Sequence, residues 1–286
     1  MILVTGATGN VGREVVRQLV AAGEEVRALS RHPERAGWPD VVERVAGDLT
    51  QELPADLFDG VDAVYLFPEP TRVQAVVEAA AAAGVRHVVV LSSLAAGLGP
   101  AEGLEVLQRR HLDVEEAVET SAMTWTHVRP GMFMTNTLGW AESIRTDDVV
   151  REPYPDATAA PVHEVDIAAV AVAALRDPAR HGGAAYPLSG PETLSQADRV
   201  RVLSEVLGRP VRFEEQTRDQ ARARMLANPW MNERLADSLL DMLAASVGAR
   251  EGEVLPTVED VLGRPPLDFA TWVGDHRAAF TPAPGA

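Results

Sequence analysis

The sequence predicts an α/β fold in which a doubly wound, Rossmann-type parallel sheet is followed by a smaller, mainly helical C-terminal substrate region. Three observations lead to this prediction. An apolar run at residues 1–4 passes through a glycine-rich turn into a helical pattern at residues 13–22. Further short apolar runs then alternate with helical patterns up to residue 190, which is typical of parallel strands joined by helices. Beyond residue 190 the patterns are helical almost throughout.

The first turn contains Gly6, Thr8, Gly9, Asn10, Val11 and Gly12, with the glycines spaced G-x-x-G-x-x-G. Gly6 allows a tight turn, Gly9 lets the backbone approach a pyrophosphate, and Gly12 lets the helix pack closely. The following helix N-terminus would offer N–H groups to the phosphates. A second strand at residues 25–29 completes a βαβ unit, which favours a dinucleotide site over an ordinary glycine-rich turn.

The remaining elements are expected in the following order. Strands are predicted at residues 41–45, 61–67, 86–91, 125–128 and 184–188, with helices at 71–83, 104–120 and 167–175 and a loop at 100–103. Helices are predicted at residues 194–207, 218–226, 230–247 and 269–280, with a short strand at 211–213. We expect residues 1–190 to form an NAD(P)-binding domain, residues 131–165 to contribute to a substrate cleft, and residues 191–286 to cover it.

The end of the second strand bears on the choice of cofactor. Ser30 and Arg31 stand where an acidic residue would bind the ribose hydroxyls of NAD. A hydroxyl and a guanidinium suit a 2′-phosphate, so we expect NADP(H), although a solvated arginine is the alternative. Asp48, after the third strand, could accept a hydrogen bond from the adenine amino group or cap the next turn.

Apolar side chains follow the strands at the edge where ligands bind in open α/β sheets. We place Phe67 beside the cofactor and Pro68, Met132 and Phe133 beside the substrate, although core filling is the default for such residues. Ser92 and Ser93 directly follow the strand predicted at residues 86–91, at the same edge.

Composition excludes several kinds of chemistry. The chain has no cysteine and no lysine, so thiolate nucleophiles, cysteine metal sites and lysine Schiff bases are not possible. The net charge of −16 argues against a nucleic-acid surface. No apolar run is long enough to cross a membrane, and we expect a cytoplasmic protein with no metal site and a small-molecule substrate.

Several blocks together resemble the NmrA-like, atypical branch of the short-chain dehydrogenase/reductases. They are residues 5–12, Ser30–Arg31, residues 47–48, 91–93, 126–133 and 162–168, and residues 263–266 with Trp272. The resemblance covers nearly the whole chain and implies a Rossmann domain, a small substrate domain and a cleft between them. Related proteins would be NADPH-dependent quinone oxidoreductases, triphenylmethane reductases and, more distantly, isoflavone-type reductases.

The chain departs from the wider family's Tyr-x-x-x-Lys pair, because it has three tyrosines and no lysine. Leu107 falls where the tyrosine is expected. His111 falls where isoflavone-type reductases carry a lysine, although a histidine on an apolar helix face can equally be a core residue. If it faces the cofactor in neutral surroundings, it should titrate near its ordinary pKa of about 6.5.

These features predict an NADPH-dependent oxidoreductase that transfers hydride to a flat conjugated acceptor, such as an aromatic quinone or an enone. Ser92 or Ser93 would bind the developing oxyanion, and His111 would position or protonate it. The alternative is a catalytically inactive NADP(H) sensor of the NmrA type that acts through a protein partner. A sugar- or polyketide-modifying reductase is a third reading of the same resemblance.

Overall fold

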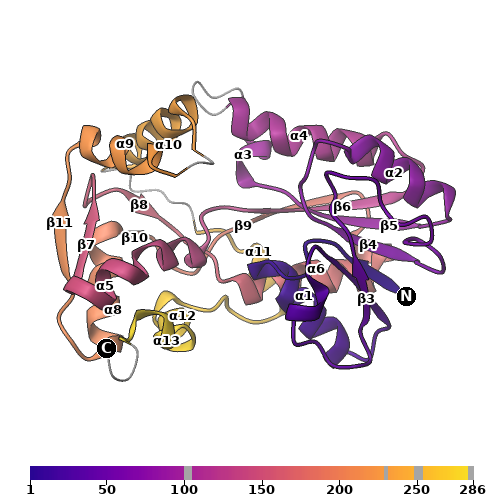
Figure 1. Ribbon diagram of the computed structural model, residues 1–286, viewed down its shortest axis with the longest axis horizontal. Helices are drawn as coiled ribbons and strands as arrows, with labels where there is room; N and C mark the ends of the chain where they lie inside the picture. Colours follow the sequence, from indigo (N-terminus) through magenta and orange to yellow (C-terminus); the bar gives the residue numbers. More distant parts are fainter. Residues whose placement is uncertain (100–104, 229–230, 248–253, 283–286) are drawn as a thin grey trace.

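The structure is a computed structural model that describes residues 1–99, 105–228, 231–247 and 254–282. A parallel sheet with helices on both faces forms one part, and a smaller, mainly helical part lies beyond the carboxyl ends of the strands (Figure 1). The predicted loop at residues 100–103 and the predicted helix starts at Leu104 and Trp230 lie outside the described residues.

The central sheet confirms the predicted fold class. Its seven strands are all parallel, in the order β3-β2-β1-β4-β5-β6-β9. They are β1 (Ile2–Val4), β2 (Val26–Ser30), β3 (Glu43–Ala46), β4 (Ala63–Leu66), β5 (His87–Leu91), β6 (Thr124–Pro130) and β9 (Ala184–Leu188). β6 runs two residues further than predicted, because Arg129 and Pro130 pair with the last two residues of β9.

Each face of the sheet is covered by helices, as Figure 1 shows. One face packs against α1 (Asn10–Ala21), α6 (Glu164–Arg176) and α11 (Thr257–Leu262). The other face lies under α2 (Val73–Ala82), α3 (Leu94–Gly97) and α4 (Glu105–Glu119). The alanines of α6 allow it to lie close to α1, and the strands β1, β2, β4 and β5 between the layers are buried on both faces. A short helix α7 (Pro178–His181) and a 3-10 turn η1 (Pro33–Arg35) complete this part.

The smaller part has its own buried core around Met134, Phe269 and Trp272. Its elements are η2 (Met134–Trp140), α5 (Ala141–Asp147), β7 (Val149–Glu152), β8 (Thr158–Ala159), β10 (Leu194–Ser195), α8 (Gln196–Leu207), β11 (Arg212–Glu215), α9 (Arg218–Leu226), α10 (Glu233–Ala245), α12 (Phe269–Asp275) and α13 (Arg277–Phe280). Parallel pairing of β7 with β11 joins a segment that precedes β9 to one that follows it.

Two predicted helices differ from those observed. The helix expected at residues 194–207 begins at Gln196, because Leu194 and Ser195 pair with β8 and Ser195 then caps α8 through a reciprocal bond with Asp198. The helix expected at residues 269–280 is divided at His276 into α12 and α13. The sequence analysis did not predict α11 or β7.

A buried polar cluster joins the two parts. Glu164, at the start of α6, is 5% exposed and accepts a hydrogen bond from Trp272 Nε1 at 3.0 Å. The same carboxylate lies 3.0 Å from His276 Nε2. These contacts fix α12 against the sheet part and hold the two parts in a defined arrangement.

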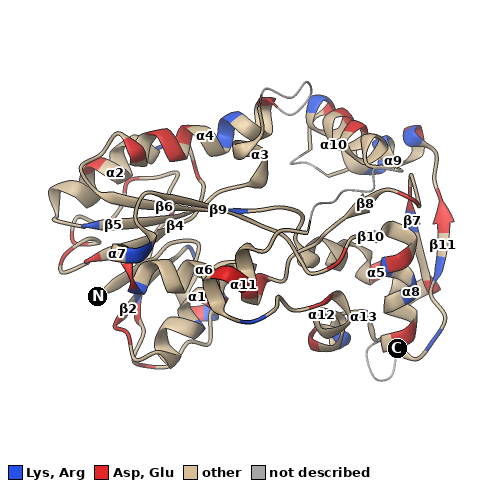
Figure 2. Ribbon diagram, turned by 180° about the vertical axis from the view of Figure 1, so that it is seen from behind, with Lys and Arg blue, Asp and Glu red and all other residues tan. Residues whose placement is uncertain are grey.

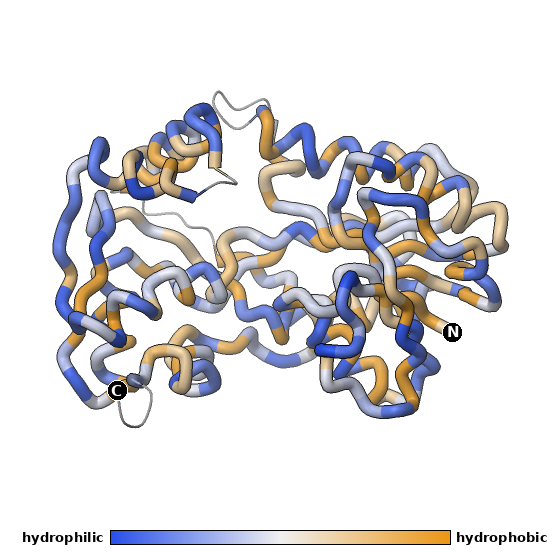
Figure 3. Tube along the Cα trace, in the orientation of Figure 1, coloured by the Kyte–Doolittle hydropathy of each residue, from blue (hydrophilic) through white to orange (hydrophobic). Residues whose placement is uncertain are grey.

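Charged residues lie mainly on the outer helices, such as α2, α4 and α10, whereas the central strands are largely free of them (Figure 2). Figure 3 shows the complementary distribution, with hydrophobic segments running through the sheet. Within the described part of the chain, none of the helices has the length and apolar character needed to span a membrane.

Candidate functional site

The glycine turn joins β1 to α1 and leaves the start of α1 open. No side chain caps the first N–H groups of this helix, and its first turn carries no acidic residue. Thr8, Gly9 and Asn10 are exposed, whereas Val11 and Gly12 are buried and face the core. Uncapped N–H groups at the positive end of a helix dipole suit a phosphate, so the turn fits the pyrophosphate of a dinucleotide.

The three glycines of the turn meet different demands. Gly6 has a φ of +58°, and a Cβ on it would lie 2.9 Å from the Phe67 Cβ. A Cβ on Gly12 would lie 2.2 Å from the Gly6 carbonyl oxygen, so the turn itself requires both glycines. A Cβ on Gly9 would meet only that same oxygen, at 3.2 Å. Gly9 is therefore open on its outer side, where a ligand would approach.

The end of β2 is tied to this turn through Ser30. The Ser30 hydroxyl lies 3.1 Å from the Thr8 hydroxyl and accepts a hydrogen bond from the His32 N–H at 3.2 Å. Arg31 is exposed and forms no ion pair with any described residue. Its guanidinium is therefore free to bind an anion such as a 2′-phosphate.

Asp48 acts as the cap that the sequence left as an alternative. Its Oδ1 accepts hydrogen bonds from the N–H and the hydroxyl of Thr50, both at 2.9 Å. These bonds lower the pKa of Asp48, and the charge of Arg31 adds to the effect. The second carboxylate oxygen has no hydrogen-bond partner among the described residues, so capping leaves it available to an adenine amino group.

At the carboxyl edge of the sheet, three of the four predicted apolar residues are accessible. Phe67 is 37% exposed, and Met132 and Phe133 are half-buried in the segment after β6. Backbone hydrogen bonds to Val162 on both sides of Phe133 hold this segment in place. Pro68, by contrast, is buried and offers a substrate little surface.

His111 is half-buried on α4, and its Nδ1 has no hydrogen-bond partner within the described structure. Burial and the neighbouring charge of Arg110 lower the pKa of His111 to about 4, and Glu115 opposes this only in part. The condition for titration near 6.5 is therefore not met, because burial and the charge of Arg110 both disfavour the protonated ring. At pH 7 the ring is an uncharged imidazole that can donate a single N–H.

One turn after His111, Glu115 forms a buried ion pair that the sequence reading did not identify. Glu115 is 2% exposed, and its two oxygens accept hydrogen bonds from Arg129 Nε at 2.9 Å and Nη2 at 2.6 Å. Burial alone would raise the pKa of Glu115, but the hydrogen bonds from Arg129, with the nearby Ser92 hydroxyl and the charges of His127 and Arg129, hold it below its usual 4.5. The available signal was a glutamate on the apolar face of the predicted helix.

The two serines after β5 have different surroundings. Ser92 is 3% exposed, and its hydroxyl points toward the Glu115 carboxylate without a hydrogen bond of good geometry. Ser93 is half-buried, and its hydroxyl caps α3 by accepting the Ala95 N–H at 3.2 Å. The hydroxyl proton of Ser93 stays free for another acceptor, so Ser93 is the more accessible donor.

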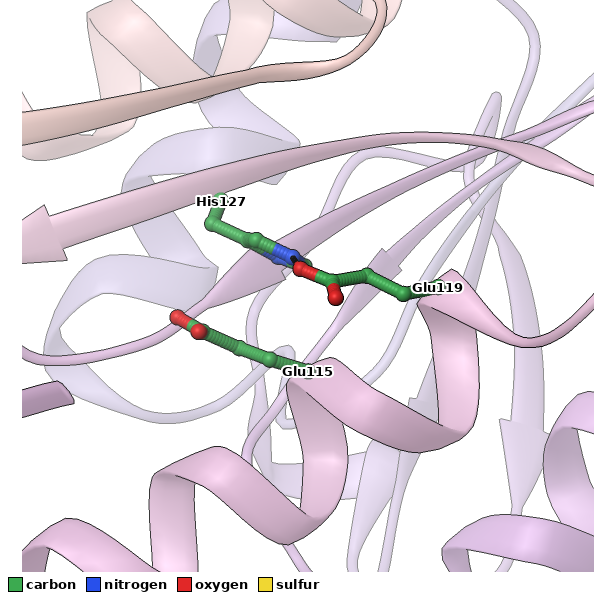
Figure 4. A group of neighbouring side chains, drawn as sticks. All are labelled: Glu115, Glu119 and His127. Atoms are coloured by element: carbon green, nitrogen blue, oxygen red, sulfur yellow. Dashed lines mark hydrogen bonds and ion pairs between the residues drawn. The ribbon is translucent and has the colours of Figure 1, made fainter. Parts of the chain in front are cut away.

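Figure 4 shows Glu115, Glu119 and His127, whose potential ligand atoms lie within 4.8 Å of one another. His127 Nε2 is already bound to Glu119 at 2.9 Å. Both oxygens of Glu115 are held by Arg129, whose positive charge would repel a cation. We therefore assign this cluster to the structure of the α4–β6 contact and not to a metal site.

A cavity of about 630 Å³ lies between α4 and α10, beside the loop after β4. Its lining includes Glu69, Arg110 and Arg234. Arg234 of α10 lies 3.7 Å from Glu105 of α4, so an ion pair crosses between the two parts. Its lining includes none of Phe67, Met132 and Phe133 and no residue of the segment 131–165, so this cavity is distinct from the predicted substrate cleft.

None of the three tyrosines is on α4. Tyr65 is 1% exposed within β4, and burial raises the pKa of its phenol. Tyr186 lies in β9, with its hydroxyl 2.7 Å from Nδ1 of His181 in α7, and Tyr154 precedes β8. The site therefore lacks the tyrosine acid of the wider family.

A parallel doubly wound sheet, with an open glycine turn after its first strand, defines a Rossmann-type dinucleotide-binding protein. A family model described as NAD(P)H-binding matches residues 6–178, which is more than half of the chain. The protein belongs to this NAD(P)H-binding family.

Two relatives match almost the whole chain. A (4-alkanoyl-5-oxo-2,5-dihydrofuran-3-yl)methyl phosphate reductase of Streptomyces griseus subsp. griseus is 45% identical over 290 residues, covering 99% of this chain and 100% of the relative. An NAD(P)H azoreductase of Xenophilus azovorans is 39% identical, covering 98% of this chain and 99% of the relative. The protein is accordingly an NAD(P)H-dependent oxidoreductase.

Among solved structures, the NADPH complex of an NADPH-dependent quinone oxidoreductase from Escherichia coli superposes with a TM-score of 0.78. The two chains are 23% identical, and the match covers 97% of this chain and 100% of the other. This likeness supports the fold assignment.

Proposed function

We propose that the enzyme uses NADPH to reduce a flat conjugated acceptor of the quinone or enone type. The observation that carries the proposal is the combination, at one sheet edge, of accessible apolar side chains with weak proton donors. Phe67, Met132 and Phe133 supply the apolar surface. The unpaired Arg31 at the end of β2 supports NADPH as the hydride donor.

The names of the two relatives fit this class of acceptor. The Streptomyces griseus protein is named for a dihydrofuran ring whose double bond is conjugated with a carbonyl group. The Xenophilus azovorans protein is named for azo compounds, which are also conjugated. Because both are named as reductases, they favour an enzyme over the alternative of a catalytically inactive NADP(H) sensor.

We propose that Gly9, Asn10 and the first N–H groups of α1 hold the pyrophosphate, and that Thr8, Ser30 and Arg31 hold the adenosine end. Asp48 would accept from the adenine, and Phe67 would contact the nicotinamide side. NADPH, when bound, supplies the hydride that adds to an electron-poor atom of the acceptor. Residues 131–165 and 191–286 would cover the substrate.

The donors at the site suit an acceptor that stabilises negative charge by itself. Reduction of a quinone or enone delivers the charge to an oxygen as a phenolate or enolate, which needs less proton donation than a simple alkoxide. We propose that Ser93 donates its hydroxyl proton in a hydrogen bond to this oxygen and that neutral His111 donates an N–H. The Glu115–Arg129 pair holds α4, and with it His111, against β6.

The test is NADPH consumption measured with quinones, enones and azo dyes, together with NADPH affinity. We expect turnover of at least one conjugated acceptor and none of simple ketones. In the Ser93→Ala variant, the turnover should fall about 10²-fold or more, which is the lower end for the loss of one oxyanion donor. Tight NADPH binding without turnover of any acceptor would instead support the sensor.

A further inference from the structure

The first turn of α8 contains a buried arginine with no acidic partner. Arg199 is 1% exposed, and among the described residues no carboxylate lies within ion-pair distance of it. Its Nε is buried and has no hydrogen-bond partner in the described structure. Arg27, the other arginine that is buried among the described residues, is bound by Glu43 at 2.8 Å and by three backbone carbonyls, so Arg199 has far fewer polar partners than Arg27.

The contacts that Arg199 does make are weak ones. Nη1 lies 3.6 Å from the Met132 sulfur, and the guanidinium carbon lies 5.1 Å from the centre of the Trp140 ring. The charge of Glu152 raises the pKa of Arg199, but the Glu152 oxygens bind Trp140 Nε1 at 3.0 Å and Arg224 at 2.5 Å. A thioether and an aromatic face replace only part of the hydration that the cation has lost.

The position of Arg199 in the helix makes the burial of its positive charge still less favourable. Arg199 is four residues after the Ser195 cap of α8, so it lies near the end of the helix dipole that favours anions. Burial lowers the pKa of Arg199 to about 10, which leaves it charged at pH 7. Folding therefore places a full positive charge in an apolar site without an anion to balance it, which is unfavourable for stability.

The position of Arg199 links it to the substrate. Arg199 contacts Met132, which follows Gly131 at the carboxyl end of β6. Met132 is half-buried and belongs to the apolar surface that we assign to the site with Phe67 and Phe133. Met132 is unbranched and flexible, so it can move aside for a ligand group. The guanidinium thus contacts a flexible side chain that we place beside the substrate.

We propose that Arg199 binds an anionic group, an oxyanion such as a phosphate, on the acceptor that is reduced at this sheet edge. This inference rests on the proposed function and narrows its substrate class to anionic conjugated acceptors. The anion would displace the Met132 thioether and accept hydrogen bonds from the planar guanidinium, for which a phosphate or sulfonate has the right geometry.

The test compares 1,4-naphthoquinone with 1,4-naphthoquinone-2-sulfonate, which differ only in the anionic group. We expect wild type to favour the sulfonate in kcat/KM, and Arg199→Met to lower the ratio of the two values by about 10- to 100-fold, as for one charged hydrogen bond. Arg201→Met is the matched control, since Arg201 lies on the exposed side of the same helix and binds Asp198 and Glu205. A wild-type enzyme without this preference, or an equal loss for both quinones, would overturn the proposal.

A second measurement does not depend on turnover. With the cofactor site saturated by NADP⁺, phenyl phosphate should raise the melting temperature of wild type and of Arg201→Met but not of Arg199→Met. An equal rise in all three proteins would indicate an adventitious anion site and overturn the assignment. If Arg199→Met does not fold, Arg199→Lys replaces it, and we expect it to reduce both effects because the ammonium lacks the planar fork. An Arg199→Lys enzyme with the wild-type ratio would contradict the inference.

Discussion

The choice between NADPH and NADH can be tested at Arg31. Its side chain forms no ion pair in the described structure, so its replacement removes no contact that supports the fold. Each hydrogen bond between a guanidinium and a 2′-phosphate should contribute about 1.5–3 kcal/mol. The variant Arg31→Asp should therefore weaken NADPH binding by about 10- to 100-fold for one such bond, and more for two.

The structure adds a second contribution to this loss. Arg31 is close enough to lower the pKa of Asp48, so an aspartate in its place would put two carboxylates beside the phosphate. NADH has no 2′-phosphate, and its affinity should change little. The ratio of the two dissociation constants therefore isolates the interaction with the phosphate.

The assay is a fluorescence titration of both cofactors on wild type, Arg31→Asp and Arg35→Asp. Arg35 is a suitable control because it lies in the same loop, is exposed and contacts only Glu34 within ion-pair distance. Melting temperatures should agree among the three proteins. Equal losses for NADPH and NADH in Arg31→Asp, or a similar loss in Arg35→Asp, would refute the assignment of Arg31 to the 2′-phosphate.

Three further predictions follow from particular contacts. His111→Ala should lower quinone turnover about 10²-fold with NADPH affinity unchanged. Because the pKa of His111 is lowered to about 4, the pH profile of wild-type turnover should show no bend between about pH 6 and 7. A bend in that range that the substitution removes would contradict the lowered pKa. Arg129→Met leaves the Glu115 carboxylate buried and unpaired, and urea unfolding at pH 7 should show a loss of about 3–5 kcal/mol in the free energy of unfolding. Since the pKa of Glu115 is below 4.5 in the folded protein, the stabilisation by the ionised carboxylate is present above that pH and is lost on acidification. The difference in unfolding free energy between wild type and Arg129→Met should therefore become smaller in acid. Gly12→Ala should lower both the melting temperature and the NADPH affinity, because its Cβ would lie 2.2 Å from the Gly6 oxygen, whereas Gly139→Ala, where a Cβ meets nothing within 4 Å, should leave both unchanged.

The parts of this protein that depend on neighbouring residues could be predicted from the sequence. The β1–turn–α1 unit, β9 and α9 are of this kind, and the last two have the predicted bounds. Their signals are an apolar run, a helical period or a glycine at a turn, which act within a few residues. The glycine turn and the end of the second strand predicted a nicotinamide dinucleotide, and the match to an NAD(P)H-binding family confirms this cofactor class.

Tertiary structure decided which charges are paired and which polar groups are buried. Glu115 and Arg129 belong to a helix and a strand that the sequence placed separately, and only the packing of α4 on β6 brings them together. The same packing buries His111 and lowers its pKa, and the fold leaves Arg199 of α8 beside Met132 without an acid. Desolvation and ion pairing depend on contacts between elements far apart in the chain, and no local pattern of residues encodes those contacts.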